Sequence, residues 1–115
     1  MKSDLLYLHN IMESIKIIEK HTKNIDLKNF SCSILIQDAI SKRLEEIGEN
    51  IKKISNKIRL KYPSVKWEEY VNTRNFLTHV YQMLNVKRLW KIIKEDLPIL
   101  NKQIEKIIKE IQNEK

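Results

Sequence analysis

Apolar residues recur at intervals of three and four along most of the chain, the spacing that places them on one face of an α-helix. The first such segment follows Ser3, a candidate N-cap, and continues to about His21. After a polar connection, a longer segment begins near Phe30 or Ser31, and its stripe of isoleucine and leucine continues to Ile58. The pattern therefore predicts two helices in the first half of the chain.

Two further helical segments are predicted in the second half. Residues 62–65 break the pattern, since a proline disfavours helix in the residue that precedes it. A third helix is expected over about 67–83, and Asn85 can cap a fourth. Pro98 interrupts the fourth helix, with Asp96 as the candidate cap of the turn that holds the proline. The expected fold is an all-α antiparallel bundle of four main helices, the last kinked or split near Pro98.

The only glycine of the chain, Gly48, lies inside the predicted second helix. A glycine there costs about 1 kcal/mol relative to alanine, so its presence predicts the close approach of another backbone. Trp67 and Trp90 are expected to anchor the core.

Length and composition fit one helical domain over residues 1–115. The single cysteine, Cys32, excludes a disulfide framework and a cysteine-based metal site, and we expect neither metal nor cofactor. No apolar run approaches the roughly 20 residues of a membrane span, and no apolar leader follows Met1. We therefore expect a soluble, cytoplasmic protein.

The formal net charge of +7 favours a polyanionic partner. Lysine, isoleucine and asparagine are abundant, as they are in proteins of A/T-rich genomes, so charge alone does not decide for nucleic acid. Because lysine greatly outnumbers arginine, an arginine beside a histidine hints at a need for the planar guanidinium.

The strongest chemical signal is the cluster Arg74, Asn75, Thr78, His79 and Tyr81 on the predicted third helix. At 100° per residue these side chains share one arc of the helix, and apolar residues occupy the opposite arc. Each of them alone is more often structural: a packed histidine or tyrosine, or an arginine in a surface ion pair. Their combination favours a site that binds a phosphodiester and moves protons.

The spacing within this cluster also predicts a dimer. Asn75 and His79 are four residues apart, so the amide can orient the imidazole. Arg74 and His79 lie about 140° apart around the helix, so one helix does not aim both at a single atom. A second copy packed across a two-fold axis could bring the arginine of one chain to the histidine of the other.

A run of basic residues near the end of the second helix is a weaker candidate. It is more often a solvated face, but it could attract a phosphate backbone. Its members are Lys52, Lys53, Lys57, Arg59, Lys61 and Lys66. Of these, Lys52, Lys53 and Lys57 are candidate substrate contacts, together with Thr78. His9 and His21 have no pairing that suggests a metal site and are expected to be structural or exposed.

The segment Arg74–x4–His79–x–Tyr81 resembles the signature of HEPN-domain ribonuclease toxins of the HepT-like type. The resemblance covers nearly the whole chain. It includes residues 44–49 (Leu-x-x-Ile-Gly-Glu), Trp67 ahead of the signature, Leu89–Trp90 and residues 96–100 (Asp-Leu-Pro-x-Leu).

The chain departs from the family pattern at two positions. Asn50 replaces a small residue, and Asn85 stands where an aspartate often follows the signature.

The resemblance implies a metal-independent endoribonuclease of a type VII-like toxin–antitoxin pair. Members act as homodimers in which arginine and histidine from both chains, here Arg74 and His79, line a cleft. A minimal nucleotidyltransferase antitoxin restrains them by transferring AMP to the tyrosine of the signature, here Tyr81. In this hypothesis His79 serves as base or acid, Arg74 clamps the phosphate oxygens, Asn75 orients His79 or the phosphate, and Thr78 is a further donor.

Two other readings stay open at this stage. The chain could be a non-catalytic helical module that binds a nucleotide or a nucleotidyltransferase. It could also be a dimeric scaffold in which the signature stabilises the seam between the chains.

Overall fold

The computed structural model describes residues 2–73, Leu77 and 83–114. The described residues form helices and connections, without a β-strand among them, in agreement with the predicted all-α bundle. The helices are α1 (Lys2–Thr22), α2 (Leu27–Ser31), α3 (Ile34–Lys53), α4 (Asn56–Lys61), α5 (Trp67–Val71), α7 (Met83–Lys91), the π-helix η1 (Ile92–Asp96) and α8 (Leu97–Asn113).

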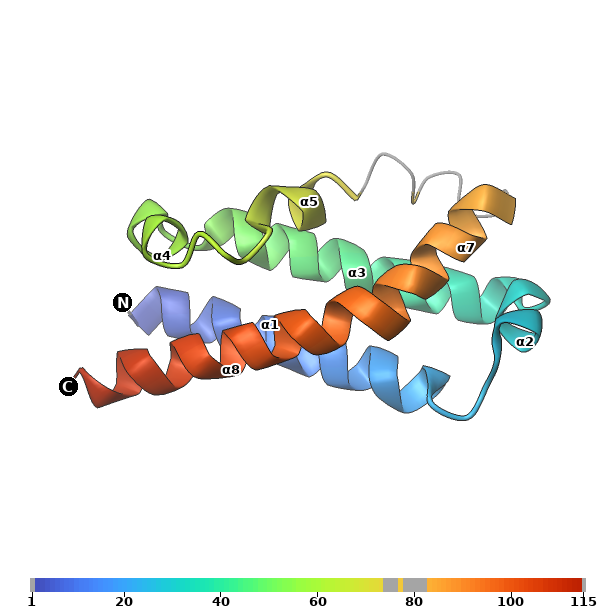
Figure 1. Ribbon diagram of the computed structural model, residues 1–115, viewed down its shortest axis with the longest axis horizontal. Helices are drawn as coiled ribbons and strands as arrows, with labels where there is room; N and C mark the ends of the chain where they lie inside the picture. Colours follow the sequence, from blue (N-terminus) through green and yellow to red (C-terminus); the bar gives the residue numbers. More distant parts are fainter. Residues whose placement is uncertain (1, 74–76, 78–82, 115) are drawn as a thin grey trace.

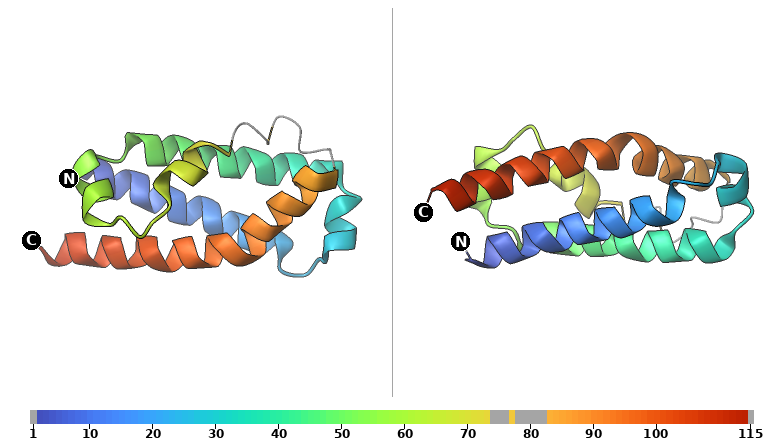
Figure 2. Two further views of the ribbon diagram at one scale, coloured as in Figure 1. Left: turned by 45° about the horizontal axis from the view of Figure 1, so that its top comes forward. Right: turned by 90° about the horizontal axis from the view of Figure 1, so that it is seen from below.

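The long helices α3 and α8 both run antiparallel to α1 (Figure 1). α1 packs against both α3 and α8, and α5 packs against the C-terminal half of α3 (Figure 2). Short helices close the two ends: α2 contacts α7 at one end, and α4 lies at the other end together with both chain termini.

The core follows the apolar periodicity. Each long helix buries a stripe at intervals of three and four, and the fully buried members include Leu8, Ile11, Ile15, Ile18, Leu44, Ile47, Ile51, Leu97, Leu100 and Ile104. At the α2 end Phe30 is fully buried, and its ring centroid lies 5.1 Å from that of Trp90. Trp67 is buried, as expected of an anchor, whereas Trp90 is half-buried with the Lys94 ammonium 4.8 Å from its ring centroid.

The predicted first cap is wrong, because α1 begins at Lys2 and Ser3 lies inside it. The neighbouring carboxylate, Asp4, serves a different helix instead. Its Oδ1 accepts a hydrogen bond from the backbone N–H of Ser55 and its Oδ2 accepts one from the Ser55 hydroxyl, both at 2.8 Å. Asp4 is buried and thereby ties α1 to the junction between α3 and α4.

The predicted boundaries of the second helix are also wrong. Phe30 belongs to the separate helix α2, which Asp26 caps by accepting a hydrogen bond from the backbone of Asn29. α3 begins only after Ser33, whose hydroxyl accepts from the N–H of Ile36. The polar stretch that was expected to be a plain connection therefore already holds the start of α2.

The second helix also ends earlier than its apolar stripe suggests. α3 ends at Lys53, Ile54 adopts an extended conformation, and Ser55 caps α4. Ile54 and Ile58 are both buried, so the stripe continues across a break in the helix.

The predicted third helix begins at Trp67 as expected, and α5 is described to Val71, followed by a turn at residues 72–73. Most of the remaining span to Met83 lies outside the described residues. Asn85 lies inside α7 and does not cap it.

The last helix is bent rather than split, which agrees with the expected kink (Figure 1). η1 ends two residues before Pro98, and the N–H of Leu97 donates to the carbonyl of Ile92, five residues earlier. A proline in an α-helix lacks a donor and its ring meets the carbonyl four residues before it, so a wider π-turn relieves that contact. Asp96 keeps a helical backbone and makes no side-chain cap, contrary to the prediction.

Replacing Asp4 with alanine should lower the free energy of unfolding by about 1–3 kcal/mol, because two donors of Ser55 lose a buried charged acceptor. Urea denaturation of Asp4→Ala measures this loss. Ser3→Ala is the matched control, since Ser3 is exposed on the same turn, and it should change the value by less than about 0.5 kcal/mol. Equal effects of the two substitutions would contradict the proposed link between α1 and α4.

Candidate functional site

The residues of the predicted site lie outside the described part of the chain. They are Arg74, Asn75, Thr78, His79 and Tyr81. The structure instead describes what surrounds this segment: α5 and Thr73 before it, Leu77 within it, and α7 after it. Leu77 is buried in the core, as predicted for the apolar arc of this helix.

A chain of hydrogen bonds fixes the start of α5. The indole N–H of Trp67 donates to the carbonyl of Tyr62 at 3.1 Å, and the Tyr62 hydroxyl donates to Glu110 on α8 at 2.7 Å. Burial, followed by the hydrogen bond to Glu110, raises the pKa of Tyr62 to about 12, so the phenol keeps its proton. α5 is therefore tied to α8 at its first residue.

The other end of α5 rests on Tyr70. Its buried phenol donates to the backbone carbonyl of Asp96, in η1, at 3.5 Å. Burial is the largest cause that raises the pKa of Tyr70 above its ordinary value, and the charges of Asp96 and Glu69 add to it. The phenol is thus held as a neutral donor.

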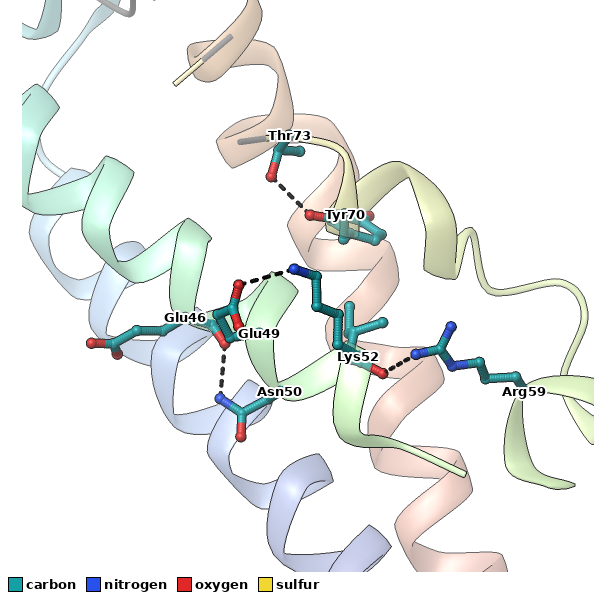
Figure 3. A network of polar contacts seen from close by, with 8 residues as sticks. Glu46, Glu49, Asn50, Lys52, Arg59, Tyr70 and Thr73 are labelled. Atoms are coloured by element: carbon teal, nitrogen blue, oxygen red, sulfur yellow. Dashed lines mark hydrogen bonds and ion pairs between the residues drawn. The ribbon is translucent and has the colours of Figure 1, made fainter. Parts of the chain in front are cut away.

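The predicted close approach at Gly48 is confirmed. A Cβ placed on Gly48 would lie 2.8 Å from the carbonyl oxygen of Tyr70 and 3.6 Å from the Cα of Val71. The same carbonyl accepts a hydrogen bond of 2.8 Å from the hydroxyl of Thr73, the residue that precedes Arg74 (Figure 3). The contact between α3 and α5 therefore lies directly ahead of the predicted site.

Two grooves adjoin the end of α5, and Tyr70 and Thr73 line both. The groove on the α3 side has a volume of about 270 Å³, and its other lining residues are Lys42, Glu45, Glu46, Gly48, Glu49 and Val71. The groove on the α7 side has a volume of about 320 Å³, and its other lining residues are Glu69, Asn72, Arg88, Lys91, Ile92 and Asp96. Among the described lining residues, those of the first groove are predominantly acidic, whereas those of the second include two cations and two carboxylates.

The carboxylates of the first groove are partly neutralised by cations of α3. Arg43 pairs with Glu46 at 3.1 Å. Lys52 pairs with Glu49 at 3.3 Å (Figure 3). Lys52 was predicted as a candidate substrate contact, and here it is an exposed partner of a groove carboxylate.

The rest of the basic run is only partly available to a ligand. Lys61 pairs with Glu114 at 2.6 Å, and Lys53 lies 5.7 Å from the centroid of the Tyr7 ring. Lys57 is exposed on α4, at the end of the bundle that carries both termini (Figure 1).

Arg59 has a structural role that the sequence reasoning missed. Its Nη2 donates to the carbonyl of Ile51, near the end of α3, at 2.6 Å, and its Nη1 pairs with Glu68 of α5 at 3.4 Å. The signal was present in the sequence, since a guanidinium retained in a lysine-rich chain suggests a need for a planar fork. Here the fork joins α3, α4 and α5.

His9 and His21 are exposed, as expected. Within residues 2–73, 77 and 83–114, no three histidine, cysteine, aspartate or glutamate side chains are grouped so as to hold a metal ion. None of the helices in this same part of the chain is long and apolar enough to cross a membrane.

The antiparallel helices and the signature after α5 define the class as an HEPN-like helical bundle. Residues 11–107 match the family described as "Ribonuclease HepT-like", and the chain belongs to this family. The family supports a ribonuclease activity and hence an RNA substrate. No solved structure matches the chain significantly.

Named relatives agree with this assignment. "Probable ribonuclease HepT" of Thermococcus cleftensis is 39% identical over 103 residues, which cover 90% of this chain and 94% of that protein. A "putative RNase" of Methanocaldococcus jannaschii is 40% identical over 99 residues, 86% of this chain and 91% of that protein.

A longer relative from the same archaeon is named "Gamma-glutamylcyclotransferase and putative RNase". It is 36% identical over 116 residues, which cover 100% of this chain and 52% of that protein. This chain therefore spans about half the length of that relative.

Arg59→Ala should lower the free energy of unfolding by about 1.5–3 kcal/mol. The substitution removes the charged hydrogen-bond donor to the Ile51 carbonyl and the ion pair with Glu68 of α5. Chemical denaturation measures the change. Lys57→Ala, which removes an exposed cation of the same helix, is the control and should stay within about 0.5 kcal/mol. Equal losses would contradict a specific role of the guanidinium.

Proposed function

We propose that this protein is a metal-independent endoribonuclease toxin that acts as a homodimer and is inactivated by AMP transfer to Tyr81. One observation carries the proposal: the Arg74–x4–His79–x–Tyr81 signature lies within the residues that match the HepT-like ribonuclease family. The partner that transfers AMP would be a minimal nucleotidyltransferase antitoxin.

The chemistry of these side chains fits RNA cleavage without a metal ion. The 2′-hydroxyl must lose a proton, the pentacoordinate phosphorus must have its negative charge stabilised, and the 5′-oxygen must gain a proton. A histidine titrates near neutral pH, so His79 can act as base or acid. Arg74 can clamp the non-bridging oxygens with two N–H groups as charge develops on them. The product would carry a 2′,3′-cyclic phosphate.

Asn75 and Thr78 would support this pair. Asn75 precedes His79 by four residues, one turn of the predicted helix, and would orient its ring or hold the phosphate. Thr78 would donate a further hydrogen bond.

The proposed homodimer follows from the separation of the two reactive groups. Arg74 and His79 lie about 140° apart on a helix, so a composite site with contributions from two chains satisfies both. The active cleft would then lie between the two copies of this segment.

The described surroundings favour one approach for the substrate. The groove on the α3 side presents Glu45, Glu46 and Glu49, and these carboxylates disfavour a phosphate backbone. Among its described lining residues, the groove on the α7 side carries Arg88 and Lys91 beside Glu69 and Asp96, so its charges balance, whereas those on the α3 side are net negative. We therefore expect RNA to reach Arg74 from the α7 side, with the candidate contacts Lys52, Lys53 and Lys57 of secondary importance.

Modification of Tyr81 would close such a site. Tyr81 lies about 20° from Arg74 around the predicted helix, so an added AMP would place its phosphate beside the guanidinium. The adenosine would occupy space that the RNA needs.

Replacing His79 with alanine should reduce RNA cleavage by roughly 10²–10⁴-fold, because proton transfer is lost. The measurement is cleavage of end-labelled tRNA and mRNA in EDTA, with the ends of the products analysed for cyclic phosphate. His9→Ala is the matched control, since His9 is exposed on α1, and it should cleave as the unchanged protein does.

The failures of this experiment are informative. If neither protein cuts, and the intact mass shows that Tyr81 is unmodified, the chain is a binding module rather than a nuclease. If His79→Ala instead dissociates the dimer or lowers its melting temperature, the signature stabilises the seam between the chains.

Tyr81→Phe should spare cleavage and abolish inactivation by the nucleotidyltransferase with ATP, because the acceptor hydroxyl is gone. Mass spectrometry should show one added adenylyl group on the unchanged protein and none on the variant. Tyr62→Phe removes a phenol outside the signature and should still be modified. Inactivation of Tyr81→Phe would show that another residue accepts the AMP.

A further inference from the structure

We propose that Gly48 is a positioning residue for the site. Because Gly48 has no side chain, the backbone carbonyl of Tyr70 can pack directly against α3, and this contact fixes the position of the backbone that leads to Arg74. This inference rests on the proposed function, in which Arg74 stabilises charge in the transition state. It assigns a task to the Leu-x-x-Ile-Gly-Glu segment, residues 44–49, beyond helix formation.

Gly48 is required because there is no room for a side chain at this position, and not because its backbone conformation excludes other residues. Gly48 lies in the middle of α3 and does not have a positive φ, so an alanine could adopt its backbone. Alanine would also favour the helix by about 1 kcal/mol. What an added methyl group meets is the Tyr70 carbonyl oxygen at 2.8 Å, a backbone atom that cannot swing away as a side chain would.

The Tyr70 carbonyl that packs against Gly48 also accepts a hydrogen bond from Thr73. The Thr73 hydroxyl donates to it at 2.8 Å, and the Thr73 carbonyl in turn accepts the N–H of Leu77 at 3.2 Å. Thr73 is buried, and Arg74 follows it by one peptide bond. A shift of the Tyr70 carbonyl is therefore passed to the first residue of the signature.

Packing on the far side keeps α5 from moving freely. The Tyr70 phenol donates to the Asp96 carbonyl of η1, and Trp67 is tied to Tyr62 at the start of the helix. A methyl group at position 48 would push α5 away from α3 and against these two hydrogen-bonded contacts. We therefore expect the backbone at the end of α5, together with Thr73, to be displaced.

Misplacement of a charge-stabilising group should lower kcat more than it raises KM, because the group acts mainly in the transition state. Errors of about 1 Å in such positioning can cost roughly 100-fold in rate. We expect Gly48→Ala to lower kcat at least ~10-fold and to change KM by less than ~3-fold.

The test compares RNA cleavage, melting temperature and amide hydrogen exchange for four variants. Thr73→Val removes the hydroxyl bond to Tyr70 at nearly constant volume and should lower kcat about 3- to 10-fold. Thr73→Ser keeps the hydroxyl and should restore kcat to within about twofold. Ile15→Val, in the fully buried core of α1, controls for a general loss of stability and should leave kcat within about twofold.

Hydrogen exchange gives a readout that does not require activity. Gly48→Ala should accelerate exchange of the Leu77 amide, whose acceptor is the Thr73 carbonyl, relative to the Ile15→Val control. Unchanged exchange at Leu77, or an equal kcat in Gly48→Ala and the unchanged protein, overturns the inference. So does a loss of kcat in Ile15→Val as large as that in Gly48→Ala.

Failure of the proposed function is distinguishable from failure of this inference. If the unchanged protein does not cut RNA, the nuclease proposal fails, and exchange at Leu77 alone decides whether Gly48 controls the entry into the signature. If Gly48→Ala does not fold, the pair Thr73→Val and Thr73→Ser decides it, and equal kcat values for these two overturn the inference.

Discussion

A helix of five residues does not hold its shape in water, and α5 has only residues Trp67–Val71 with which to carry the chain toward the signature. Its position therefore comes entirely from its packing against α3 and from the ties that Trp67 and Tyr70 make to neighbouring segments. In this packing the Tyr70 carbonyl oxygen lies 2.8 Å from the point where a Cβ on Gly48 would be. α3 in turn packs against α1, so the long core of the bundle supports this five-residue helix.

Polar side chains set the helix ends, whereas apolar side chains set the helix packing. Asp4 acts on Ser55 across 51 positions, and the amide of Gln37 donates to the carbonyl of Phe30 at 2.8 Å where α2 meets α3. Arg59 bonds a carbonyl near the end of α3. These side chains are buried or largely so, and their bonds replace those that the helix ends would otherwise make to water.

This division explains how much of the fold the sequence could predict. The core stripes, the bend near Pro98 and the backbone contact at Gly48 depend on spacing or on one residue type, and each was predicted correctly. The end of the second helix was not, because Ile54 and Ile58 keep the apolar period across a break that only the three-dimensional partner Asp4 reveals.

The candidate site divides in the same way. Its reactive residue types could be named from the signature, because chemistry depends on local composition and spacing. The two grooves beside Thr73 could not, because they arise where α5 meets α3 and η1, elements that lie far apart in the sequence. The residue type of Arg59 signalled a planar fork, but its partners, the Ile51 carbonyl and Glu68, could not be named from the sequence.

The two chain termini lie at the end of the bundle that carries α4, while α7 begins at the opposite end beside α2 (Figure 1). A second domain joined to either terminus would start some distance from the beginning of α7 and could extend away from it. The architecture is thus compatible with a fused domain at that end of the bundle, away from the beginning of α7.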